Sequence, residues 1–236
     1  MREKMKKKNT IVWDLDGTLM DTIVDLKNAV NYALRINGME ERTLVEVKQF
    51  VGNGVRRLIE LSVPESMERG KRNPELFEKV FTDFKSYYVE HCQDNTGLYE
   101  GIAEALKALK GKGIRMAVVS NKLQQGVTEL ANSEVHTVGK NDSIRLCDYM
   151  DVSIGERPEI ARKPAPDMVV KALEELGAEK DEAVYVGDSE VDVLTARNSG
   201  LPCISVLWGF RSIDVLKEYG ADTFVKHPIE IVSMFE

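Results

Sequence analysis

The sequence predicts an α/β fold in which a Rossmann-like parallel sheet is interrupted by an all-helical insert. Short apolar runs alternate with amphipathic helical segments along most of the 236 residues. Alternation of strand and helix indicates βαβ units with right-handed crossovers, and therefore a parallel sheet. From about residue 22 to residue 92 the hydrophobic period is helical throughout, so we interpret this block as an insert. The length suits one large domain, or one domain that carries a small insert.

Six apolar runs are the candidate strands of the sheet. The first, Ile11-Val12-Trp13, ends abruptly in polar residues, as expected of a buried parallel strand at its carboxyl end. The later runs cover residues 114–119, 152–154, 183–186 and 203–207, with a weaker run at 223–225. Helical patterns separate most of them. One such pattern, 168–176, is followed by Gly177, where a helix C-cap often falls.

The insert carries three amphipathic stripes, at residues 23–34, 44–51 and 76–88. We therefore expect a core domain made of residues 1–20 and 95–236 and a helical cap domain made of residues 21–94. Linkers at 19–22 and 93–98 are placed to act as hinges of a lid that excludes water from a reaction on the core. The polar segment 133–148 is either a loop or a small hairpin on the core.

Composition excludes several classes of protein. A net charge of -7 argues against a protein that coats nucleic acid, which is usually basic. No stretch approaches 18 consecutive apolar residues, and the basic N-terminus lacks the apolar region of a secretory signal, so we expect neither a membrane span nor secretion. Three widely spaced cysteines without a C-x-x-C pair fit a reducing, cytoplasmic setting. The sequence leaves monomer and homodimer open.

Polar residues follow the candidate strands at the points where ligands bind in parallel sheets, beyond the carboxyl ends. The residues that follow the strands in chain order are Asp14 and Asp16, then Ser120 and Asn121, then Lys163, and finally Asp188 and Asp192. Four carboxylates at one rim repel each other unless a cation neutralises them. Oxygen ligands of this kind suit a hard ion, and Mg2+ is the usual partner of phosphate.

These residue types together predict phosphoryl transfer through a covalent intermediate. Asp14, fixed at the end of its strand, is the candidate nucleophile that forms an aspartyl-phosphate. The metal and Lys163 would offset repulsion between this carboxylate and the phosphate. Asp16 lies two residues on and is placed to act as general acid and then general base. Asp188 is a metal ligand, whereas Asp192 either binds the metal through water or orients Lys163.

Phosphoryl oxygens need donors as well as a cation. The Ser120 hydroxyl and the backbone amides of Asn121 and Thr18 are the candidates for this task. Each feature alone has a simpler interpretation, since Asp and Gly favour turns and Ser favours helix N-caps. Taken together, the polar residues that follow the four strands favour a phosphate site.

The chain resembles the haloacid dehalogenase superfamily and is similar to its phosphoglycolate phosphatase group. The matching segments are Asp14-Leu15-Asp16-Gly17-Thr18-Leu19, Val119-Ser120-Asn121-Lys122, Arg162-Lys163-Pro164-Ala165-Pro166-Asp167 and Gly187-Asp188-Ser189-Glu190-Val191-Asp192. The resemblance implies Asp14 as nucleophile and metal ligand, and Asp16 as acid/base that also gives the metal a backbone carbonyl. It implies that Ser120 binds phosphate, that Lys163 stabilises charge, that Asp188 binds Mg2+ and that Asp192 supports the metal.

The resemblance also extends to the insert, which is similar to the small helical cap of the family. The segment Val51–Ile59 resembles the cap loop that reaches toward substrate, which makes Gly52, Asn53, Gly54 and Arg56 candidates for substrate specificity. A plain turn between cap helices is the alternative for Gly52-Asn53-Gly54.

The predicted function is Mg2+-dependent hydrolysis of a small phosphate monoester, with 2-phosphoglycolate favoured by the resemblance. A beta-phosphoglucomutase-like phosphotransferase is the alternative, but such mutases typically carry Glu-Asp where this chain has Gly187-Asp188. Pyrophosphatases and nucleotide phosphatases of the superfamily remain open. A non-catalytic binding protein on this fold would be expected to lack the nucleophile or a metal carboxylate, and both are present.

Overall fold

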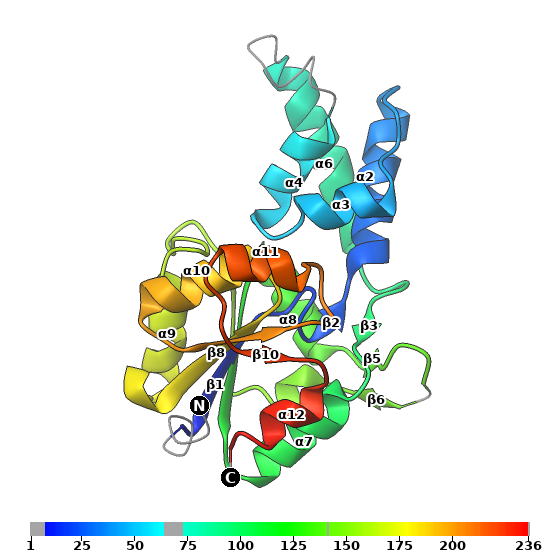
Figure 1. The fold of residues 1–236 in the computed structure, drawn as a ribbon. Coiled ribbons are helices and arrows are strands. Elements are labelled where there is room, and N and C mark those ends of the chain that lie inside the picture. Colours follow the sequence, from blue (N-terminus) through cyan, green and yellow to red (C-terminus); the bar gives the residue numbers. More distant parts are fainter. Residues whose placement is uncertain (1–7, 64–72, 141, 236) are drawn as a thin grey trace. The chain divides into compact units, whose positions relative to one another are not determined.

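The computed structural model describes residues 8–63, 73–140 and 142–235. The described residues form two compact units, one within Met1–Asp21 and Gly97–Glu236 and the other within Thr22–Thr96. The first is the α/β unit and the second is the helical unit (Figure 1). Parts of the predicted core (1–7, 141 and 236) and of the predicted cap (64–72) lie outside the described residues.

The α/β unit is built on a six-stranded sheet in which every neighbouring pair is parallel. In spatial order the strands are β10 (Phe224–Val225), β9 (Cys203–Val206), β8 (Ala183–Gly187), β1 (Thr10–Trp13), β4 (Arg115–Leu123) and β7 (Val152–Glu156). The first strand of the chain therefore lies inside the sheet, between β8 and β4 (Figure 1). This arrangement confirms the predicted α/β fold class.

Helices cover both faces of the sheet. Successive side chains of β1 point to opposite faces, so each packs against a different set of helices. Ile11 and Trp13 pack in the cluster formed with α7 (Ile102–Gly111), α8 (Gln124–Asn132) and α12 (Pro228–Val232). Val12 packs in the other cluster, with α9 (Asp167–Leu176) and α10 (Glu190–Ser199). The side chains of the predicted apolar run Ile11-Val12-Trp13 are all completely buried.

Smaller elements complete the unit. Two antiparallel pairs join β2 (Met20–Asp21) to β3 (Gly97–Leu98) and β5 (Val135–His136) to β6 (Ser143–Ile144). The second pair shows that segment 133–148 contains the small hairpin, followed by the short 3-10 helix η1 (Leu146–Asp148). The remaining elements are η2 (Lys180–Glu182) and α11 (Ile213–Glu218).

The strand predicted at 114–119 extends to Leu123 in the structure, so the prediction placed its end four residues too early. Its pairing with β7 shifts register between Val119 and Leu123. The polar residues Ser120, Asn121 and Lys122 interrupt the apolar run in the sequence. They nevertheless continue the strand and are buried at its carboxyl end.

The helical unit contains α2 (Ile23–Ile36), α3 (Leu44–Phe50), α4 (Gly54–Ser62) and α6 (Pro74–His91) among its described residues. Each buries one face, and α2 packs along α6. A buried carboxylate links the two ends of the unit. Asp25 accepts hydrogen bonds from the backbone and side chains of Asn95 and Thr96. These contacts join the start of α2 to the segment after α6.

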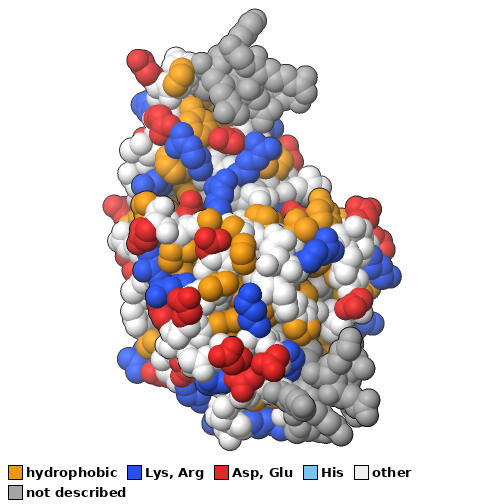
Figure 2. All heavy atoms as spheres, turned by 90° about the vertical axis from the view of Figure 1, so that its left-hand side faces the viewer, with side chains coloured by type: hydrophobic (Ala, Val, Ile, Leu, Met, Phe, Trp, Pro, Cys, Tyr) orange, Lys and Arg blue, Asp and Glu red, His pale blue; other side chains and the backbone are white. Residues whose placement is uncertain are grey.

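One face of the protein is of mixed charge. Figure 2 shows basic and acidic side chains interspersed on one face, with hydrophobic side chains between them. No helix among the described residues is both long enough and apolar enough to cross a membrane.

Gly177 ends α9 in the left-handed conformation, with φ of +60°. Changing Gly177 to Ala is expected to lower the free energy of unfolding by about 1 kcal/mol, because a Cβ disfavours positive φ. Gly111 at the end of α7 is the matched control, since it lies outside the left-handed region and its Cβ would meet nothing within 4 Å. Gly111→Ala should be neutral or stabilising in urea denaturation. Equal losses in both variants would contradict this explanation of the helix end.

Candidate active site

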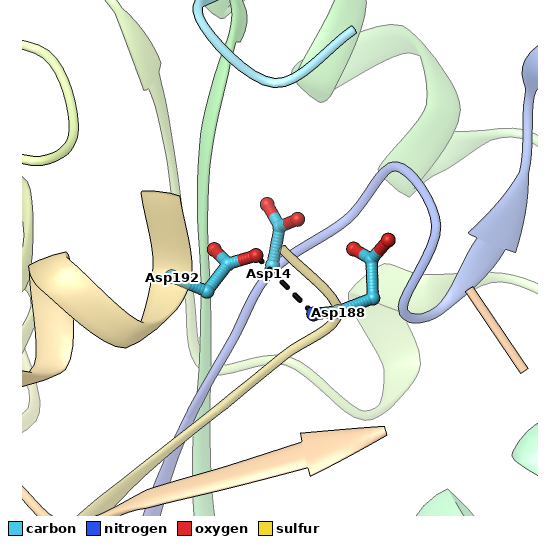
Figure 3. Close-up of side chains that lie close together, drawn as sticks. All are labelled: Asp14, Asp188 and Asp192. Atoms are coloured by element: carbon cyan, nitrogen blue, oxygen red, sulfur yellow. Dashed lines mark hydrogen bonds between the residues drawn. The ribbon is translucent and has the colours of Figure 1, made fainter. Parts of the chain in front are cut away.

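The candidate site lies at the carboxyl ends of the central strands. Asp14 directly follows β1, and its amide donates to the carbonyl of Val186 in β8 at 2.9 Å. Asp188 directly follows β8, and Asp192 lies in the first turn of α10. All three carboxylates are buried, and one oxygen from each lies within 4.8 Å of the others (Figure 3). The structure thus gathers three of the four carboxylates predicted at this rim into one cluster.

Lys163 supplies the positive charge of the cluster. It lies in the loop between β7 and α9, yet its side chain is only 3% exposed. Its Nζ donates to Asp14 Oδ1 at 2.5 Å and to Asp192 Oδ1 at 2.9 Å. The third contact is with the hydroxyl of Tyr185, at 3.0 Å. The ammonium group therefore has one acceptor for each of its three protons.

Asp192 is saturated with hydrogen bonds. Its Oδ1 accepts from Lys163 and from the Tyr185 hydroxyl, while its Oδ2 accepts from the amides of Asp188 and Ser189 and from the Ser189 hydroxyl. A carboxylate offers about four lone-pair positions, and here five donors occupy them. Of the two roles considered for Asp192, this geometry favours orientation of Lys163 over metal ligation.

Capping explains why Asp192 turns back toward Asp188. Ser189 is the N-cap of α10 and Asp192 is its third helical residue, so the two form a capping box. Asp188 itself precedes the helix, so the two carboxylates come from different parts of this turn rather than from one helix face. The side chain of Asp192 is completely buried, although aspartates on helices usually face solvent.

Burial and neighbouring charges perturb every group in the cluster. Burial alone would lower the pKa of Lys163, but Asp14 and Asp192 raise it above its ordinary value. Burial opposes ionisation of Asp192 as well, but Lys163 and the Ser189 hydrogen bond hold its pKa below the usual range. These two groups therefore form a charged pair at neutral pH.

The other two carboxyls are shifted in the opposite direction. Burial, followed by the charge of Asp192, raises the pKa of Asp14 well above its usual range. The same two causes raise the pKa of Asp188 to about 7. A cation close to both would favour their ionised forms.

The donor set fits a hard divalent cation. Three carboxylates and one ammonium leave two formal negative charges in a buried site, which one divalent ion would neutralise. Carboxylate oxygens are the ligands that Mg2+ prefers. Because Asp192 is saturated, the carboxylates able to hold the ion are Asp14 and Asp188.

Asp16 lies apart from this cluster in its contacts. Its Oδ1 accepts from Lys122 Nζ at 3.1 Å, and the Lys122 side chain is only 3% exposed. The predicted acid/base group is therefore paired with a buried ammonium.

The predicted phosphate-binding residues lie on β4 and in the loop after β1. Ser120 and Asn121 are buried. The side-chain amide of Asn121 donates to the backbone carbonyl of Lys163 at 2.9 Å. The Ser120 hydroxyl accepts from the Lys122 amide at 3.1 Å. The backbone amide of Thr18 donates to the Leu15 carbonyl at 3.3 Å, while the Thr18 hydroxyl donates to Asp188 Oδ1 at 3.2 Å. Phosphate binding by these residues stays a prediction.

The sequence profile of the haloacid dehalogenase-like hydrolases matches residues 11–206, which include every site residue predicted from the sequence. The chain belongs to this family. A phosphoglycolate phosphatase of Aquifex aeolicus is 31% identical to it over 226 residues, covering 96% of each protein. A phosphoglycolate phosphatase of Rhodobacter capsulatus is 34% identical over 203 residues, covering 85% of each.

Solved structures agree with this assignment. A crystal structure from Lactobacillus delbrueckii subsp. bulgaricus, of a protein assigned as a phosphoglycolate phosphatase, has a TM-score of 0.83 and 34% identity. It is matched over 95% of this chain and 97% of its own. A predicted phosphoglycolate phosphatase from Haemophilus somnus has a TM-score of 0.84 at 23% identity and shows the shared haloacid dehalogenase-like fold.

The candidate specificity residues belong to the helical unit. Gly52 and Asn53 precede α4, and Gly54 is its first residue. Arg56 lies further along the first turn, where its guanidinium pairs with Glu78 and lies 5.0 Å from the centre of the Phe77 ring. Substrate recognition by this segment stays a prediction, and Arg56 would have to exchange its Glu78 partner for a substrate anion.

Three groups of the candidate site could not be predicted from the sequence. The apolar run marks Tyr185 only as a strand residue, although a buried tyrosine hydroxyl needs a polar partner and thus carries a signal. Lys122 gives no signal of its burial. The third group is the amide of Phe210, which donates to Asp188 Oδ2 at 2.7 Å. It comes after the run 203–207, where the next three residues carry no charged side chain that would mark a site.

Cation affinity is expected to depend on pH through Asp188. Because burial and Asp192 raise the pKa of Asp188 from 3.8 to about 7, its carboxyl must lose a proton before it binds a metal. The affinity for Mg2+ should rise by about tenfold or more per pH unit between pH 5 and 7.

The same shift affects stability without metal. The folded protein retains a proton that the unfolded chain releases above about pH 4, so the metal-free protein should lose stability as the pH rises toward 7. Thermal denaturation with and without Mg2+ at pH 5, 6, 7 and 8 measures both effects, with Asp188→Asn as the control. A Mg2+ affinity that stays constant from pH 5 to 7 would contradict the assignment.

Proposed function

We propose that this protein is a Mg2+-dependent phosphoric monoester hydrolase that acts on 2-phosphoglycolate through an aspartyl-phosphate on Asp14. The observation that carries the proposal is the buried contact between Asp14 and Lys163, with Asp188 beside it. The relatives of Aquifex aeolicus and Rhodobacter capsulatus, both phosphoglycolate phosphatases, support the reaction class and the substrate.

In the first step an Asp14 carboxylate oxygen attacks phosphorus, and the bond from phosphorus to the alkoxy oxygen breaks. Asp16 gives its proton to that departing oxygen, which leaves as an alcohol. In the second step water attacks phosphorus, and the bond to Asp14 breaks to release inorganic phosphate. Asp16 accepts the proton that the water loses, so both residues return to their starting state.

The surrounding residues hold the charges in place. Lys163 neutralises Asp14 and is kept in position by Asp192 and Tyr185, so the ammonium needs no reorganisation during the reaction. Asp14 and Asp188 would hold Mg2+, which when bound supplies positive charge for the phosphoryl oxygens. The Ser120 hydroxyl and the backbone amides of Asn121 and Thr18 are the proposed donors to the remaining phosphoryl oxygens.

The substrate proposal also involves the helical unit, as a cap whose residues Gly52, Asn53, Gly54 and Arg56 meet the substrate's carboxylate. We further propose a cytoplasmic protein, in keeping with three cysteines that form no disulfide. No partner other than small molecules is required by this function, whether the protein is a monomer or a homodimer.

The geometry at Gly187 favours hydrolysis over a mutase-like reaction. A Cβ at position 187 would overlap the Cβ and Cγ of Asp192. A glutamate at this position, as in the Glu-Asp pair typical of the mutases, would displace the carboxylate that orients Lys163. The local packing therefore supports the phosphatase alternative.

Phosphate release from 2-phosphoglycolate, pyrophosphate, nucleoside monophosphates and sugar phosphates tests the proposal directly. Wild-type protein with Mg2+ should show its highest kcat/KM on 2-phosphoglycolate. Asp14→Asn should reduce kcat by about 10⁴-fold or more, because the amide is not a nucleophile. Asp148→Asn, in an exposed pair with Arg145 away from the site, is the control and should retain activity. Wild-type turnover by Asp14→Asn would disprove the mechanism.

The role of Asp16 can be separated from binding by changing the leaving group. Asp16→Asn should lose about 10² to 10⁴-fold in the rate of phosphorylation by 2-phosphoglycolate, whose alkoxide needs a proton. Phosphorylation by p-nitrophenyl phosphate should fall far less, because p-nitrophenolate leaves unprotonated. The burst of p-nitrophenolate in rapid mixing measures that step without the later hydrolysis. Equal losses with both substrates would point to a structural role.

A further inference from the structure

The segment Trp208–Arg211, which comes after β9, contacts the carboxylate of Asp188. We call this segment the clasp. The Phe210 amide donates to Asp188 Oδ2 at 2.7 Å, while the Thr18 hydroxyl donates to Oδ1 at 3.2 Å. Each oxygen of Asp188 thus has a donor that fixes the rotation of the carboxylate.

The approach of the clasp depends on a missing side chain. A Cβ at Gly209 would overlap both the Cβ of Asp188 and the carbonyl oxygen of Gly17. Gly17 faces the same carboxylate, since its own Cβ would lie 2.5 Å from Asp188 Oδ2. Asp188 is therefore enclosed by two backbone segments that approach it closely only because both positions are glycine.

Two further contacts tie the clasp to the loops that carry the site. The Trp208 indole donates to the Thr18 carbonyl at 3.0 Å, which joins the clasp to the loop after β1. Arg211 donates to both oxygens of Glu190, from Nε at 2.7 Å and from Nη2 at 3.2 Å. Glu190 is the first residue of α10, and the Arg211 and Glu190 side chains are only 10% and 18% exposed. A largely buried pair joined by two hydrogen bonds of this kind is stronger than an exposed ion pair.

We propose that the clasp is a positioning element that holds Asp188 in the orientation needed to bind a divalent cation. This rests on the proposed function only in the choice of Mg2+ as the ion. Groups that orient a ligand typically influence metal affinity by about 10- to 100-fold when they are removed. The clasp residues act through Asp188 and the backbone around it, so they are positioning residues and need not touch substrate.

Binding of Mg2+ to the substrate-free protein tests the proposal. Gly209→Ala should raise the dissociation constant by about tenfold or more, because its methyl group displaces Asp188 or Gly17. Arg211→Gln removes the attachment to Glu190 without a clash and should weaken binding in the same direction, by about threefold or more. Isothermal titration calorimetry and the Mg2+-dependent rise in Tm provide two readouts that require no turnover.

Matched controls change the same residue types elsewhere. Gly111→Ala adds a methyl group with nothing within 4 Å, and Arg115→Gln removes an arginine paired with Glu182 at the start of β4. Both should bind Mg2+ like the wild type. Circular dichroism shows whether each variant is folded, and Arg211→Gln decides the matter if Gly209→Ala does not fold.

The outcomes separate this proposal from the proposed function. Unchanged Mg2+ affinity in folded Gly209→Ala or in Arg211→Gln would overturn the clasp, and so would a wild-type protein that binds no Mg2+. A wild type that binds Mg2+ but does not hydrolyse 2-phosphoglycolate would count against the proposed substrate alone. In that case the affinities of the variants still decide whether the clasp positions Asp188.

Discussion

The ammonium of Lys163 is enclosed between Asp14 and Asp192, and the rest of the site depends on this contact. A buried charge without partners is far more costly than an exposed one, so the three groups stabilise one another only if all are held in place. β1 fixes Asp14, the capping box of α10 fixes Asp192, and the loop before α9 delivers Lys163. The adjacent parallel strands β1 and β8 bring Asp14 and the start of α10 to a common edge, while the Lys163 loop follows β7, on the far side of β4.

Because hydrogen bonds occupy both oxygens of Asp192, the three carboxylates have different roles. With its oxygens occupied by Lys163, Tyr185 and the start of α10, Asp192 carries negative charge without being free to bind a cation. Asp14 and Asp188 hold the remaining charge, and their raised pKa values show that the cluster by itself opposes it. The same burial that disfavours these charges strengthens their attraction to a cation, because the dielectric around them is low.

The sequence was sufficient to predict the six strands of the main sheet, apart from the end of β4, and the residue types gathered at their carboxyl ends. Strand ends are local features, so Asp14, Ser120, Lys163 and Asp188 could be predicted from apolar runs and the polar residues that come after them. The partners of those residues depend on packing between segments far apart in the chain. Lys122 reaches Asp16 across 106 positions and Phe210 reaches Asp188 across 22, and neither contact has a local pattern. Tyr185 could be predicted in part. A tyrosine in a buried strand needs a polar partner for its hydroxyl, but the sequence does not show which residue that is.

Glycines explain how so many charges and backbone donors fit in one place. Cβ atoms at Gly17 and Gly209 would collide with Asp188, and one at Gly187 would collide with Asp192. Without these side chains, the amides of Asp188, Ser189 and Phe210 come within hydrogen-bond distance of carboxylates. Backbone donors lose little entropy when they bind an anion, because the strands and helix already fix them. The positions of the glycines therefore matter as much as those of the aspartates, since they determine how closely the backbone can approach each carboxylate.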